Sequence, residues 1–268
     1  MNPLFDSHCH FDFPEFDADR EKIWSGCQLL GIKQLMIPGV SPDQWPRAQQ
    51  LAQRLPGIWF SAGVHPWLVE QVWPQIRRRG FTTDMAQALE EQLSHWLAQD
   101  RCLALGECGL DAAIDLPLEL QMDLLKLQLQ LASRLNRPLI LHCRKAHNEL
   151  LQLLNRQSLP AGGVIHAFSG SLELARQYWA KGFYLGVGGT ITYERAAKTR
   201  AAVAAMPLAA LLLETDAPDM PLAGYQGQRN SPEKLLRVAE CLAELRSENF
   251  ETIVFQTCAN AEKLFGLA

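Results

Sequence analysis

The sequence of 268 residues lacks any apolar run of about 20 residues, the length that an α-helix needs to cross a bilayer. Its N-terminus lacks the basic segment followed by an apolar segment that marks a secretory signal. It also lacks the Gly-rich loops GxGxxG and GxxxxGK(S/T), which bind nucleotide phosphates after a strand. We therefore expect a cytoplasmic protein with no membrane partner and no nucleotide cofactor.

Basic residues and paired cysteines are also scarce. The 25 Lys and Arg residues are outnumbered by 29 Asp and Glu residues, which gives a formal net charge of −4. This balance argues against a surface that coats nucleic acid, although it leaves a local binding site open. The seven cysteines are an odd number and form no CxxC pair. We expect reduced thiols in the core and no disulfide framework.

Short β-rich runs alternate with helical patterns along the chain, which is typical of α/β proteins with a parallel sheet. Runs such as LMIPGV, PLILHC and LLLETD are apolar throughout, as in strands covered on both faces. Eight runs are the number that a closed (β/α)8 TIM barrel needs. The first prediction is therefore one barrel domain over residues 1–268, and the alternative is an open doubly wound sheet.

The expected strands are residues 4–10, 34–40, 58–64, 102–109, 138–143, 163–168, 183–189 and 209–216. The expected helices are residues 17–30, 43–55, 84–99, 117–136, 146–156, 172–181 and 194–204, and two or three closing helices follow a loop at 221–232.

Polar residues interrupt these apolar strands at their carboxyl ends, which in a barrel share one face where catalytic groups gather. In the stretch NPLFDSHCHFDFP, His8 and His10 are one residue apart and point to the same side of a strand. Taken alone, this pair is as typical of half-buried histidines bonded to acidic neighbours as of metal ligands. The other residues at strand ends are His65, Glu107, His142, His166 and Asp216.

Charged groups buried at several strand ends are costly without counter-ions, and a divalent cation supplies the missing charge. Imidazole and carboxylate are its natural ligands. Four imidazoles and two carboxylates (His8, His10, His142, His166, Glu107 and Asp216) exceed what one tetrahedral ion uses in an open catalytic site. The sequence therefore predicts two divalent ions at the carboxyl ends of the strands.

Seven motifs, in order and spacing, resemble the TatD family of metal-dependent hydrolases and deoxyribonucleases, which is related to the amidohydrolase superfamily. They are DSHCHFD, GVHP, GECGLD, LHCRKA, HAFSGS, LLLETDAP and CANAEKLFGL, and they cover almost the whole chain. The resemblance implies a (β/α)8 barrel. It also implies that His8, His10 and Asp216 hold one ion, that His142 and His166 hold the other, and that Glu107 bridges the two.

Under these roles, two ions lower the pKa of a shared water toward neutrality and neutralise charge on a phosphoryl group. Asp216, with Glu107 as the bridge, would orient that water and accept its proton. His65 and Arg144 are the candidate substrate contacts; the alternatives are a loop histidine fixed by Pro66 and a surface arginine at a helix start.

Other residues have more than one interpretation. Glu214, two residues before Asp216, is expected to sit deeper and to hold the ring N–H of a ligand. The aromatic residues Trp45, Trp67, Trp73 and Phe168 line a compact pocket or stack bases, and the loop residues Tyr225, Arg229 and Asn230 overhang the site or only connect elements.

The residues after GECGLD, AAIDLPLE, lack the aromatic and basic side chains that many family members carry there, which weakens the contacts expected for single-stranded DNA. A phosphodiesterase acting on DNA as an exonuclease remains the first prediction. The alternatives are a small-molecule ester, amide or phosphoester hydrolase on the same barrel, and a non-catalytic metal-binding adaptor. Zn is the expected metal, with Mn or Mg as alternatives, and the sequence identifies no protein partner.

Overall fold

The computed structural model describes residues 3–267, and within them the chain divides into two compact units. Unit 1 comprises residues 3–37, 55–58 and 165–267, and unit 2 comprises residues 38–54 and 59–164. This division does not test the prediction of a single domain over residues 1–268, which stays a prediction.

Unit 1 contains two pairs of parallel strands. Strand β1 (Leu4–Asp6) pairs with β2 (Ile32–Ile37), and β7 (Phe183–Val187) pairs with β8 (Leu211–Leu213). Directly after β1, the N–H of Ser7 donates to the carbonyl of Leu213 over 2.9 Å, so β8 lies beside β1. The helices are α1 (Arg20–Leu29), α8 (Leu172–Ala180), α9 (Ala197–Ala205), α10 (Leu235–Arg246) and α11 (Phe250–Phe265).

Unit 2 contains β4 (Cys102–Asp111), which runs parallel to β3 (Ile58–Ala62) on one side and to β5 (Leu139–Arg144) on the other. Most of the short strand β6 (Gly163–Ile165) also belongs to this unit. The helices are α2 (Trp45–Arg54), α5 (Thr83–Leu97), α6 (Leu118–Leu135) and α7 (His147–Leu154), together with two short helices outside the predicted helical ranges, α3 (Val69–Val72) and α4 (Ile76–Arg79).

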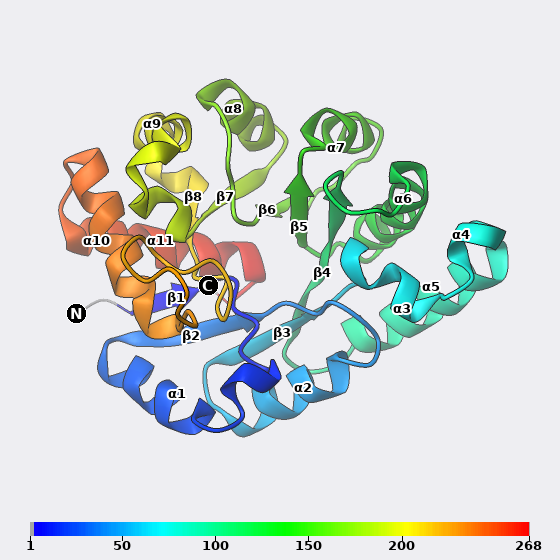
Figure 1. Ribbon diagram of the computed structural model, residues 1–268, viewed down its shortest axis with the longest axis horizontal. Coiled ribbons are helices and arrows are strands. Elements are labelled where there is room, and N and C mark those ends of the chain that lie inside the picture. The colour runs from blue at the N-terminus through cyan, green and yellow to red at the C-terminus, as the bar shows by residue number, and fades with distance from the viewer. Residues whose placement is uncertain (1–2, 268) are drawn as a thin grey trace. The chain divides into compact units, whose positions relative to one another are not determined.

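The eight strands belong to one sheet, and their order in the sheet is their order in the chain, β1 to β8. A doubly wound open sheet would instead place its first strand in the interior of the order. Sequential order, with β8 returning to β1 through the Ser7–Leu213 bond, is the topology of the predicted (β/α)8 barrel. Figure 1 shows the alternation of strands and helices along the coloured chain. The predicted fold class is confirmed.

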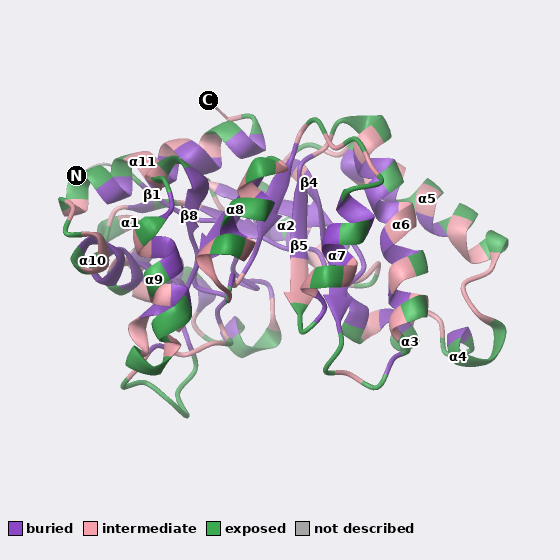
Figure 2. Ribbon diagram, turned by 90° about the horizontal axis from the view of Figure 1, so that it is seen from above, coloured by how far each residue is buried: buried purple, intermediate pink, exposed green. Residues whose placement is uncertain are grey.

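Burial follows the predicted patterns. Nine of the ten residues of β4 are buried, as expected for a strand that is covered on both faces. In Figure 2 the strands are mostly purple, whereas the helices are purple on one side and green on the other. Helix α6 buries Leu125, Leu129 and Ala132 at helical spacing and ends at Asn136, whose left-handed backbone (φ 49°) closes it. Its bounds differ by one residue at each end from the predicted range 117–136.

Candidate metal-binding site

The first polar cluster, called here the unit 1 cluster, consists of His8, His10, His166, Glu214 and Asp216. Strand β1 ends at Asp6, so the prediction that His8 and His10 lie on one face of a strand is wrong. Their backbone is instead held by the segment that follows β8, because Asp216 N–H donates to the carbonyl of His8 and His10 N–H donates to that of Ala217, each over 2.8 Å. These bonds take the place of the regular hydrogen bonds between neighbouring strands.

The side chains of His8 and His10 nevertheless converge on one point. The Nε2 atom of each ring lies 3.5 Å from the same oxygen, Oδ1 of Asp216. All three residues are buried. Asp216 has a left-handed backbone (φ 56°), a conformation that aspartate tolerates better than most residues and that ends the extended run after β8. Two imidazole nitrogens and a carboxylate oxygen at this spacing form a donor set that suits a divalent ion.

Asp6 supports this arrangement from behind. Its carboxylate accepts hydrogen bonds from the backbone N–H of Thr215 (2.9 Å) and from the Thr215 hydroxyl (2.6 Å), which links β1 to the residue before Asp216. Burial raises the pKa of the Asp6 carboxyl to about 7, although the bonds from Thr215 act against this rise. Asp6 is therefore a positioning residue, which the sequence analysis did not identify.

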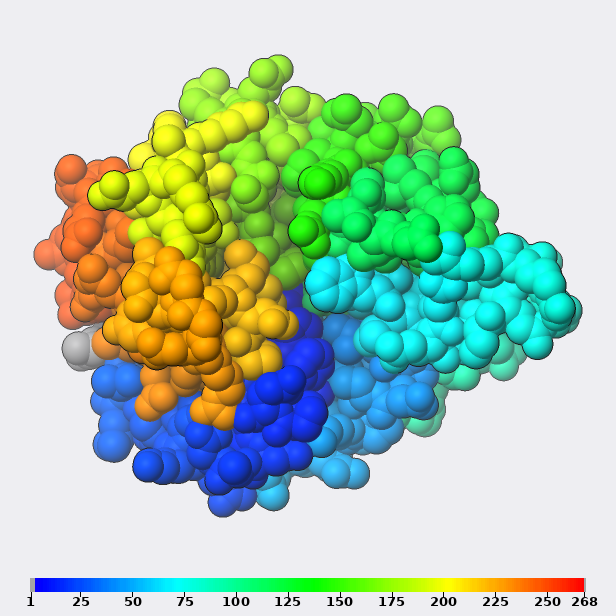
Figure 3. All heavy atoms as spheres, viewed as in Figure 1, coloured from blue at the N-terminus to red at the C-terminus, as the bar shows by residue number. Residues whose placement is uncertain are grey.

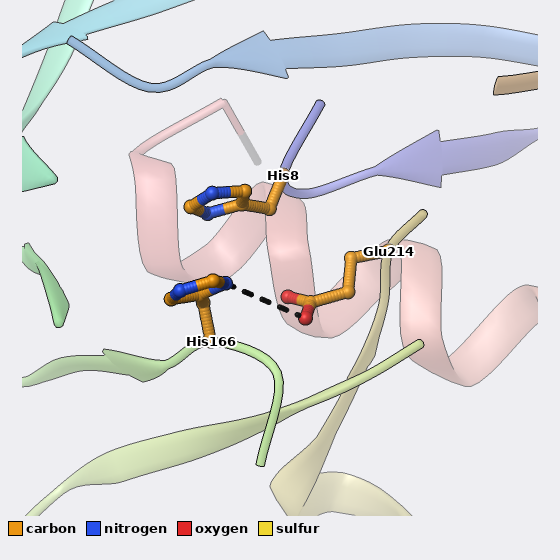
Figure 4. A group of neighbouring side chains, drawn as sticks. All are labelled: His8, His166 and Glu214. Atoms are coloured by element: carbon orange, nitrogen blue, oxygen red, sulfur yellow. Dashed lines mark ion pairs between the residues drawn. The ribbon is translucent and has the colours of Figure 1, made fainter. Parts of the chain in front are cut away.

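His166 follows β6 and joins the same cluster. Its ring is stacked on that of His8, with centroids 3.9 Å apart and planes 10° apart. Its Nδ1 lies 3.8 Å from Oε1 of Glu214, as Figure 4 shows. One donor atom each from His8, His166 and Glu214 lies within 4.8 Å of the others, so these three residues are also able to hold an ion.

Glu214 is completely buried, and one of its carboxylate oxygens accepts from the backbone N–H of Ala167. The other oxygen, Oε2, has no hydrogen-bond partner among the described residues. Burial raises the pKa of Glu214 to about 8, and the neighbouring His166 opposes the rise. A buried carboxylate oxygen without a partner is costly, and a cation nearby would remove that cost. The donor set of this cluster thus fits a divalent ion.

The second cluster, called the unit 2 cluster, consists of His65, Glu107, Asp111 and His142. Oε1 of Glu107 lies 3.3 Å from Nε2 of His65 and 3.3 Å from Nδ1 of His142. These three residues form another group whose donor atoms lie within 4.8 Å of one another. His65, predicted as a substrate contact, is therefore also placed as a possible ligand. Its Nδ1 accepts the backbone N–H of Trp67 (3.1 Å), which leaves Nε2 directed at Glu107.

Asp111 was missed by the sequence analysis, although it follows Glu107 and Gly109 at the spacing of one strand face. Its Oδ2 lies 3.2 Å from Nε2 of His142 and accepts from the indole N–H of Trp67 (2.6 Å), while Oδ1 accepts from the N–H of Ala113 (2.8 Å). Burial alone would raise the pKa of Asp111, but these hydrogen bonds outweigh it and hold the pKa well below its usual range. The ionised carboxylate of Asp111 thus holds the ring of His142 in place.

Arg144 ends β5 and pairs in register with Asp111 at the end of β4. Its side chain is exposed and makes no hydrogen bond or ion pair within residues 3–267. It is therefore accessible to a ligand near the unit 2 cluster. Of the aromatic candidates, Trp45 and Phe168 are buried, with 0% and 3% exposure, so neither stacks a base, and Trp73 is half-buried. Trp67 is 55% exposed.

The loop after β8 is tied down by its own polar residues. Arg229 binds both carboxylate oxygens of Asp19, at 3.0 and 2.6 Å, and its guanidinium lies over the ring of Phe16. Figure 3 shows this gold and orange loop against the blue segment that contains these partners. The buried amide of Asn230 donates to the carbonyls of Thr215 and Asp219. Both residues therefore shape the loop through contacts within the protein.

Across residues 3–267, none of the helices combines the length and the apolar composition that a membrane crossing requires.

Comparison with known proteins finds relatives in sequence and in structure that match nearly the full length of the chain. The family model described as TatD related DNase matches residues 5–266. An uncharacterized metal-dependent hydrolase of Escherichia coli K12, YjjV, is 41% identical over 98% of each chain. The 3'-5' ssDNA/RNA exonuclease TatD of Escherichia fergusonii is 32% identical over 99% of this chain and 100% of its own length. The crystal structure of YjjV superposes with a TM-score of 0.90 at 40% identity, covering 99% of this chain and 98% of that chain.

Proposed function

Because the chain belongs to the TatD family and is a metal-dependent hydrolase, we propose that it cleaves phosphodiester bonds of nucleic acid, with DNA as the first candidate, in the manner of an exonuclease. The observation that carries the proposal is the convergence of His8 and His10 on Asp216, because this donor set suits an ion with an open position. The relative named as an ssDNA/RNA exonuclease supports the substrate class.

We propose the following roles in unit 1. His8, His10 and Asp216 would hold one ion, with Glu214 beside His166 as support. The carboxylate of Asp216, buried against both rings, would orient the attacking water and accept its proton. Divalent ions supply a lowered pKa for that water and charge neutralisation at the phosphoryl group.

In unit 2, Glu107 and His142 would hold an ion together with His65. Asp111 would keep the ring of His142 in place through its contact with Nε2. The exposed guanidinium of Arg144 would bind a phosphate oxygen of the substrate. The bridging role of Glu107 and the sharing of one ion by His142 and His166 join residues of different units and stay predictions, as does the choice of Zn over Mn or Mg.

The proposal is tested by hydrolysis with metal-reconstituted protein, assayed on short single-stranded DNA, on RNA and on a panel of small phosphodiesters, esters and amides. Asp216→Asn is the control, because it keeps the size of the side chain but removes the proton acceptor. We expect cleavage of the DNA by the parent protein and its loss in the variant. Turnover of only the small substrates would replace the nuclease proposal by the small-molecule hydrolase, and no turnover of any substrate would favour the adaptor.

A further inference from the structure

The rim after β4, residues 112–117, reads AAIDLP and contains neither an aromatic nor a basic side chain. Residues from the segment after β3 contact this rim instead. Trp67 bonds to the residue just before the rim, because its indole N–H donates to Asp111 over 2.6 Å. Arg77 of α4 donates to the carbonyl of Asp115 and forms an ion pair with Glu70. Aromatic and basic groups are thus present at this rim, supplied by another part of the chain.

Trp67 is the exposed member of this arrangement. More than half of its surface (55%) is accessible, although its orientation is fixed at two points, by the indole bond to Asp111 and by the backbone bond to His65. Its ring centroid lies 5.7 Å from that of His65 and 6.5 Å from that of His142. A rigid, exposed aromatic ring next to candidate metal ligands offers a stacking surface at low entropic cost.

Arg144 lies beside Asp111 in the sheet. The two residues are partners in the parallel register of β4 and β5, so their side chains leave the sheet on the same face. Arg77 differs from Arg144 because its guanidinium is already bound to Glu70 and Asp115. The rim therefore combines one fixed aromatic ring with one uncommitted guanidinium. Single-stranded nucleic acid is recognised by this pairing of base stacking and phosphate contact.

We propose that Trp67 is the residue on which an unpaired base of the substrate stacks while Arg144 holds an adjacent phosphate. The inference rests on the proposed function and adds to it the residue that would contact a base of the substrate. A base inside a duplex cannot present its face to the indole, so paired ends would bind less well. Small phosphodiesters without a base would gain nothing from Trp67.

The first test measures binding, so that it does not depend on turnover. Fluorescence anisotropy of a labelled oligothymidylate would be followed with the full-length Asp216→Asn protein and with the same protein carrying Trp67→Ala. We expect about tenfold weaker binding with Trp67→Ala. Trp67→Phe keeps an aromatic ring but loses the N–H to Asp111, and we expect it to retain most of the affinity.

The matched control is Trp59→Ala. Trp59 lies near the start of β3, at the opposite end of the strand that precedes Trp67, and it is half-buried under the guanidinium of Arg101. We expect unchanged binding in this variant. Equal binding by the Trp67→Ala protein and its parent would overturn the proposal, as would undiminished binding when each terminal base of the oligonucleotide is removed in turn.

The second test separates stacking from a general defect in the site. The ratio of kcat/KM for single-stranded DNA to kcat/KM for an abasic deoxyribose-phosphate oligomer of the same length should fall about tenfold in Trp67→Ala and change little in Trp67→Phe. An equal loss on both substrates would mean that Trp67 acts only through Asp111 and would contradict the proposal. If the parent protein cleaved neither substrate, the proposed function would fail, and the binding measurement would still decide the role of Trp67.

Discussion

The imidazole rings of His8 and His166 are stacked face to face, with centroids 3.9 Å apart, although the two residues are 158 positions apart in the chain. Neutral imidazole is the form that binds a metal ion. Glu214 lies at the edge of this stack, next to Nδ1 of His166, and several predictions concern its carboxylate.

Glu214→Gln is expected to weaken metal binding about 10- to 100-fold, because the carboxylate that faces His166 loses its charge. The fold should persist, since the amide oxygen is still able to accept from Ala167. Metal content after dialysis and competition with a chelator would measure the effect. A variant with unchanged metal affinity would show that Glu214 has no part in ion binding.

Gly186→Ala is expected to disturb the same carboxylate sterically. A Cβ added at Gly186 would lie 2.1 Å from Oε2 and 2.7 Å from Cδ of Glu214, so the buried side chain would have to move. We expect a loss of about 1–3 kcal/mol in the free energy of unfolding, together with weaker metal binding. Chemical denaturation and metal titration would measure the two effects.

The control for this substitution is Gly224→Ala. An added Cβ there meets nothing within 4 Å, although the backbone is left-handed (φ 86°). A small loss of stability with unchanged metal affinity is therefore expected at Gly224. Similar metal affinities in the two variants would argue against the steric link between Gly186 and Glu214.

Glu214 should also make the stability of the metal-free protein depend on pH. Its pKa is about 8 in the folded state and has an ordinary value of 4.5, so the unfolded state loses this proton first as the pH rises. The contribution of this pKa difference to the free energy of unfolding is on the order of a few kcal/mol. It is complete below pH 4.5 and is lost progressively up to about pH 8. Denaturation of the parent protein and Glu214→Gln in EDTA should show a steeper fall with pH in the parent. Parallel curves would contradict the assignment.

Asp111→Asn is expected to destabilise the protein and lower its activity. Trp67 and Ala113 both donate to this carboxylate, so an amide group must turn its own N–H₂ toward one donor. The loss should be about 1–3 kcal/mol at neutral pH. Because the pKa of Asp111 is lowered in the folded state, its carboxylate stabilises the fold above pH 3.8, the ordinary pKa of an aspartate. This stabilisation is lost as the pH falls further. The difference between parent and variant should therefore shrink in acid, and a difference that grew there would refute this account.

Arg144→Ala should retain metal and mainly weaken phosphate-bearing substrates, because its exposed guanidinium contacts no ligand group. Removal of a charge-assisted bond corresponds to about 1.5–3 kcal/mol in kcat/KM for phosphodiesters. Glu107→Gln should behave differently and lose metal together with activity, since its Oε1 faces both His65 and His142.

The control for Arg144 is Arg134→Ala, which removes an exposed arginine of α6 that pairs with Glu90 over 2.7 Å. Kinetics on a phosphodiester and on a carboxylic ester would be compared for both variants. Equal losses on the two substrates in Arg144→Ala would exclude a phosphate contact, and full metal content in Glu107→Gln would exclude Glu107 as a ligand.

Hydrophobic patterning predicted the alternation of strands and helices and made the barrel the first choice over an open sheet. Helix α6 lies within one residue of its predicted ends, because both its periodic leucines and its bounding residues are local signals. Strand ends were predicted less well. The runs 4–10 and 209–216 read as strands, but β1 ends at Asp6 and β8 at Leu213. The residues beyond these ends bond to each other in an irregular pattern that no periodicity describes.

The candidate site was predicted in part. His8, His10 and Asp216 were named from their position after apolar runs, and the structure brings them together. Asp6 was considered only as an acidic neighbour of the two histidines, and Asp111 was not named, because their roles depend on partners at Thr215 and His142 that are distant in sequence. The period of two in GECGLD would have placed Asp111 on the face of Glu107.

The thiols next to the candidate ligands point to a further property of the molecule. Cys9 and Cys108 are fully buried, and burial raises the pKa of each thiol above its usual range. Thiolate is the form that reacts with peroxides, so both sulfurs are poor targets for oxidants. Oxidants should therefore leave Cys9 and Cys108 unmodified, whereas Cys143, next to His142, is only half-buried.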